Sequence, residues 1–118
     1  MITGDLGRNE YWNAQLTELQ HNVDNFKRRL SQILQRGLEP GLLERVEQFQ
    51  NLLLNKDVVI GIMRHDIVTN RQLSNMVSTS EQVNEFASKL QQDICKLKHD
   101  ITTMHAQLLA IEQAAKHS

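Results

Sequence analysis

Two short segments of the sequence share the same order of side chains that can carry chemistry. Arg64-His65-Asp66-Ile67 has a basic residue, a histidine, an aspartate and an isoleucine, and Lys98-His99-Asp100-Ile101 repeats that order. An exposed imidazole can accept a proton or a phosphoryl group, and an adjacent carboxylate can orient and polarise it. Each isoleucine also falls on an apolar helical seam, so two heptads of similar polarity would produce the same echo. We favour this second, structural interpretation.

His65, Asp66 and Thr69 resemble the phosphoacceptor box of sensor histidine kinases, in which an acid follows the histidine and Thr or Asn stands four positions on. The resemblance implies that His65 accepts the phosphoryl group, Asp66 orients it and Thr69 positions water. It also implies a helical hairpin that dimerises as a four-helix bundle. The family has proline where this chain has Asn70, and no room remains for a nucleotide-binding domain. Histidine phosphotransfer domains are closer in size, but the Lys-Gly pair that follows their histidine is absent.

The five histidines and the single cysteine offer no metal site by their spacing. No two histidines lie four residues apart, the spacing with which one helical face holds zinc. We therefore expect no metal and no cofactor, and we interpret the histidines as solvated side chains. Cys95 excludes a disulfide within the chain and, next to Ile94, is predicted to flank the core as a small apolar group. A nucleophilic Cys95 would need a base, for which His99 is the local candidate.

The elements that must position these residues are three long amphipathic helices. Apolar side chains recur at alternating spacings of three and four over about 9–36, 40–77 and 80–116. Gly37 suits the left-handed position after the first helix, and Pro40 suits the first turn of the second. A capping box before the third helix can be formed by Ser78 with Glu81, or by Thr79 with Gln82. The expected seams are Trp12, Leu16, Leu19, Val23, Phe26, Leu30 and Ile33; Leu42, Val46, Phe49, Leu53, Ile60, Met63 and Ile67; and Val83, Ala87, Leu90, Ile94, Leu97, Ile101, Met104, Leu108, Ile111 and Ala115.

Short connections make successive helices antiparallel neighbours. The sequence thus predicts one all-α domain over 1–118, an elongated, coiled-coil-like antiparallel three-helix bundle with a loose tail at 1–8. The first helix, about 14 Å shorter than the others at 1.5 Å per residue, should leave the tip of the second hairpin uncovered. Three polar residues, Lys56, Asn70 and Ser74, fall on the seam of the second helix, where such residues typically fix register and partner number.

Two stretches of apolar surface predict a partner. One is the overhanging tip, and the other is the middle of the second helix, which is apolar nearly all round. Packing of this central helix between two neighbours is the alternative explanation for the second stretch. The predicted interface comprises Leu54, Val58, Ile62, Leu73, Met76, Val77, Val83 and Phe86.

Composition and charge narrow the partners. Thirteen basic and fourteen acidic residues are interspersed, so no basic stripe is offered to nucleic acid. No run approaches the ~18 apolar residues of a membrane span, and the amino terminus lacks the pattern of a signal peptide. We therefore expect a soluble protein that contacts neither nucleic acid nor membrane. The single cysteine favours the cytoplasm.

The second helix carries a loose family resemblance. Val46-Glu47-Gln48-Phe49-Gln50-Asn51, Val58-Val59-Ile60 and His65-Asp66-Ile67 resemble small helical proteins of unknown function that are widespread in Bacteroidetes-type bacteria. The resemblance implies a bacterial cytoplasmic origin and brings no activity with it. The overall plan also resembles spectrin-type repeats, a likeness generic to three-helix seams.

Three functional hypotheses follow. The leading one is a non-enzymatic interaction or scaffold protein that self-associates as a dimer through its exposed apolar helix surface. The second is a histidine phosphotransfer or kinase-regulating module that uses His65. The third is a chaperone or adaptor whose exposed seam receives an amphipathic helix of a client protein.

Overall fold

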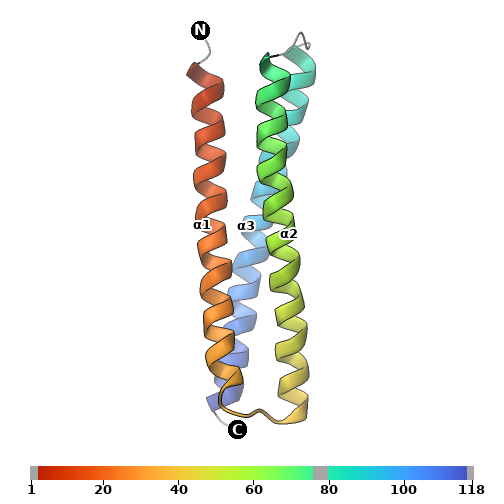
Figure 1. Ribbon diagram of the computed structural model, residues 1–118. Helices are drawn as coiled ribbons and strands as arrows, with labels where there is room; N and C mark the ends of the chain where they lie inside the picture. Colours follow the sequence, from red (N-terminus) through yellow and green to blue (C-terminus); the bar gives the residue numbers. More distant parts are fainter. Residues whose placement is uncertain (1–2, 76–79, 117–118) are drawn as a thin grey trace.

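The computed structural model is a rod of three α-helices packed side by side (Figure 1). It describes residues 3–75 and 80–116, with side chains from residue 10 onward except those of 70, 71, 73–75, 80 and 83. The helices are α1 (Thr3–Leu34), α2 (Pro40–Asn75) and α3 (Ser80–Lys116). In Figure 1 they run down, up and down within a body of 60 × 19 × 17 Å. The predicted elongated antiparallel three-helix bundle is confirmed.

The core is a single column of apolar side chains along the axis of the rod, and it consists of the predicted seams. Every predicted apolar seam residue of α1 and α2 is buried, and so are those of α3 from Ala87 to Ala115. The side chain of the remaining one, Val83, lies outside the described residues. Burial of one stripe per helix explains the alternating spacing, because only positions three and four apart share a helical face. The most enclosed large side chains include Trp12, Leu16, Ile94 and Leu108.

The turn between α1 and α2 follows the local chemistry of its residues. Gly37 has φ of +70°, the left-handed conformation that glycine adopts without steric cost at the end of a helix. Pro40 begins α2, and the carbonyl of Glu39 accepts the amide hydrogen of Leu43 at 2.9 Å. Both residues act as the sequence predicted. The predicted capping boxes depend on Ser78 and Thr79, which lie outside the described residues.

The first helix is longer than predicted. It begins at Thr3 rather than near Asn9, so residues 3–8 belong to α1 and are not a loose tail. The indole Nε1 of Trp12 donates to Oε1 of Gln91 at 2.8 Å, which sets α1 level with α3. At 1.5 Å per residue, α1 extends about 14 Å from Trp12 back to its first residue, and α3 extends about 17 Å from Gln91 back to its first residue. The predicted overhang of about 14 Å therefore shrinks to about 3 Å, and Figure 1 shows α1 reaching nearly the level of the end of α2.

Among the described side chains, three ion pairs between helices fix how the seams are aligned. Lys27 of α1 pairs with Asp57 of α2, Arg29 of α1 pairs with Glu112 of α3, and Lys56 of α2 contacts Asp100 of α3 at 3.4 Å. The Lys56 side chain is only 14% exposed, as expected of a seam position. A slip of one heptad would separate all three pairs, so these contacts together favour the observed register.

Acid is expected to weaken the bundle through the two carboxylates of these pairs. The hydrogen bond from Arg29 holds the pKa of Glu112 below its ordinary value, against the opposing effect of burial. Burial raises the pKa of Asp57, but hydrogen bonds from Lys27 and Gln20 outweigh it and leave the pKa lowered. A lowered folded-state pKa gives stability above the unfolded-state pKa, near 4, that is lost as pH falls through the folded value.

The check is urea denaturation at pH 7 and at about pH 3, followed by circular dichroism. The wild type should lose more stability between the two pH values than the double variant Asp57→Asn, Glu112→Gln. Equal losses in the two proteins would show that these carboxylates do not govern the acid response.

Candidate functional site

Helix α2 carries most of the large apolar side chains that are exposed among the described residues. Six of the nine large apolar side chains that are exposed there belong to α2, against two on α1 and one on α3. Leu54, Val58 and Ile62 are 55%, 60% and 56% exposed, and their spacing of four places them on one continuous ridge. We name these three residues the outer stripe.

The outer stripe crosses α2 obliquely from one neighbouring helix to the other. Leu54 lines a hollow of about 220 Å³ between α1 and α2, together with Leu30 and Leu34 of α1. Ile62 lines a larger groove of about 370 Å³ between α2 and α3. Val58 lies between them, where it is covered by neither helix. The alternative explanation for the many apolar residues of α2 was that its two neighbouring helices bury them. That packing does not bury these three side chains.

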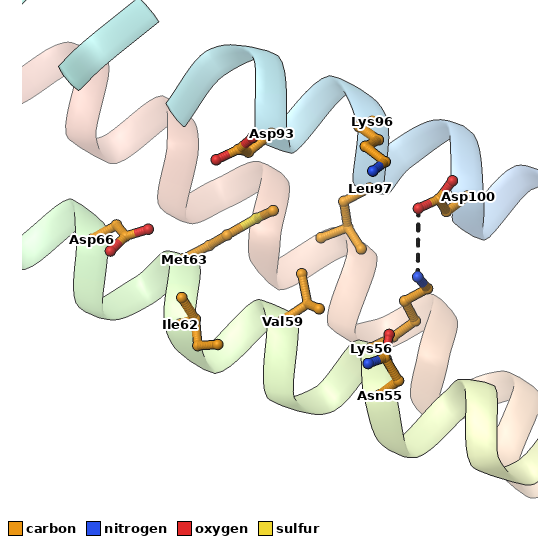
Figure 2. A pocket seen from close by; sticks show the side chains of 10 residues that line it. All are labelled: Asn55, Lys56, Val59, Ile62, Met63, Asp66, Asp93, Lys96, Leu97 and Asp100. Atoms are coloured by element: carbon orange, nitrogen blue, oxygen red, sulfur yellow. Dashed lines mark hydrogen bonds and ion pairs between the residues drawn. The ribbon is translucent and has the colours of Figure 1, made fainter. Parts of the chain in front are cut away.

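The α2–α3 groove has an apolar floor and a charged rim (Figure 2). Val59 and Met63 point from α2 towards Leu97 of α3. Three carboxylates and two amines form the rim, from Asp66, Asp93, Asp100, Lys56 and Lys96. Asp66 and Asp93 lie at one end of the groove, and Lys56 contacts Asp100 across its other end.

Not all of the predicted interface can be placed. Leu54, Val58 and Ile62 are exposed as predicted, while Phe86 is half-buried beside the buried Ala87. The side chains of Leu73 and Val83, together with Met76 and Val77, lie outside the described residues. The members of the predicted interface that are described and exposed therefore lie at the middle of α2.

Gly61 is the residue of this surface that the sequence reading missed. It lies on the outer face one turn after Val58, and a Cβ built on it would meet nothing within 4 Å. Glycine in a helix interior costs roughly 1 kcal/mol relative to alanine. Nothing in the fold of the single chain requires a glycine there. The signal in the sequence was a glycine that interrupts an apolar run, between Val58-Val59-Ile60 and Ile62.

The two His-Asp-Ile segments occupy matching positions on antiparallel helices. In both, the histidine is exposed, the aspartate lines the α2–α3 groove and the isoleucine is buried. Thr69 donates its hydroxyl hydrogen to the carbonyl of His65 at 3.1 Å, and Arg64 donates to Thr17 of α1 at 3.2 Å. The repeat of His-Asp-Ile is thus explained by the same order of exposed, groove-lining and buried positions in two heptads. The phosphoacceptor reading of His65, Asp66 and Thr69 stays a prediction.

Cys95 differs from its prediction. It is exposed rather than flanking the core, since it lies about 100° around the helix from the buried Ile94. Its Sγ accepts a weak hydrogen bond from Nε2 of Gln91 at 3.5 Å. Gln91 thereby contacts both Trp12 and Cys95.

Within residues 3–75 and 80–116, no group of three or more His, Cys, Asp or Glu side chains is arranged to hold a metal ion. None of the helices, over the same ranges, combines the length and apolarity needed to cross a bilayer. No protein-family model matches the chain, and no curated protein or solved structure is significantly similar to it.

Proposed function

We propose that the protein is a non-enzymatic interaction protein that self-associates through the outer face of α2. The observation that carries the proposal is the outer stripe, three branched apolar side chains on one ridge, each more than half exposed. Contiguous exposed apolar surface on a helical protein is where partners bind. A reducing compartment such as the bacterial cytoplasm suits the exposed Cys95 thiol.

The size of the stripe supports a reversible association. Full burial of a Val, Leu or Ile side chain contributes about 1.5–3 kcal/mol, so the exposed part of each stripe residue offers on the order of 1 kcal/mol. Two copies bring six such side chains together, a sum similar to the free energy of a complex with a dissociation constant between millimolar and micromolar. The loss of translational and rotational freedom costs about 4 kcal/mol or more, so a dimer must also bury surface beside the stripe. We expect a dimer that forms in the high micromolar range, strengthened by the grooves beside the stripe.

Sedimentation equilibrium over about 5–500 µM, a range that spans such dissociation constants, tests the proposal. The wild type should approach twice the 13.6 kDa of the chain as concentration rises. Val58→Asp should stay at the single-chain mass, because dimerisation would bury an unpaired carboxylate. Leu109→Asp is the matched control: Leu109 is 45% exposed on α3, outside the stripe, and the variant should dimerise as the wild type does.

The same experiment distinguishes self-association from binding of another protein at the outer stripe. A wild type that keeps the single-chain mass at every concentration would contradict self-association. If that protein also binds a hydrophobic dye, and Val58→Asp abolishes the binding, the stripe would instead serve an amphipathic client helix.

A further inference from the structure

We draw no further inference here: the strongest candidate, the groove between α2 and α3 that has Met63 on its floor and Asp66 and Asp93 at one end, carries nothing, because its rim holds carboxylates and amines together and nothing in the structure shows what covers it.

Discussion

Replacing Trp12 by alanine is expected to lower the free energy of unfolding by about 3–5 kcal/mol. Trp12 is 1% exposed and fills the core where α1 meets α3, and its indole donates to Gln91. Its removal leaves a cavity that rigid helices close only in part. Urea denaturation followed by circular dichroism measures the loss, since the variant lacks the chain's single tryptophan as a fluorescent probe.

Two neighbouring substitutions serve as controls for Trp12. Tyr11→Ala removes a similar aromatic ring from a side chain that is 54% exposed and should change stability by less than about 0.5 kcal/mol. Trp12→Phe keeps most of the apolar volume and should fall between the two. If Tyr11→Ala proved as harmful as Trp12→Ala, the assignment of the two faces of α1 would be wrong.

Replacing Lys56 by methionine is expected to raise the free energy of unfolding by about 1–2 kcal/mol. The Lys56 side chain is only 14% exposed at a seam position, and its 3.4 Å contact with Asp100 returns only part of the cost of burying a charged side chain. Methionine has a similar shape and suits the space between Leu53 and Ile60. Asp100 is 35% exposed, so its carboxylate stays hydrated after the pair is lost.

The matched control is Lys98→Met, which removes the same charge from an exposed site on α3 and should be nearly neutral. Thermal or urea unfolding of the two variants provides the comparison. A loss of more than about 1 kcal/mol in Lys56→Met would show that the ion pair stabilises the fold outright and does more than align it.

Periodicity was enough to predict the three helices and nearly all of the core. The burial of residues such as Leu16, Leu53 and Ile94 could be predicted from their spacing, because apolar residues three and four apart lie on one face of a helix. The positions of Gly37 after α1 and of Pro40 at the start of α2 could also be predicted, since each residue has a backbone preference that suits that position.

The start of α1 could not be predicted by the same logic. The seam positions before Trp12 are Asn9 and Asp5, which are polar, and Gly4 and Gly7 weaken the helical pattern further. The structure extends the helix through them, and the predicted overhang shrinks accordingly.

The candidate site was predicted in part. The excess of apolar residues on α2 indicated Leu54, Val58 and Ile62, but only the packed bundle shows that α1 and α3 leave all three exposed. The groove beside them needed the register of α2 against α3, which brings Asp66 and Asp100 to the same rim although 34 positions separate them. In the sequence, Gly61 indicates only a residue of low helix propensity. The structure shows in addition that the space above it is open.

The rod shape has a mechanical consequence. In a single molecule the α1–α2 turn and the α2–α3 tip lie at opposite ends of a 60 Å body, so its two poles differ (Figure 1). A dimer formed through the outer stripe, at the middle of α2, would therefore leave both ends of each rod outside the contact.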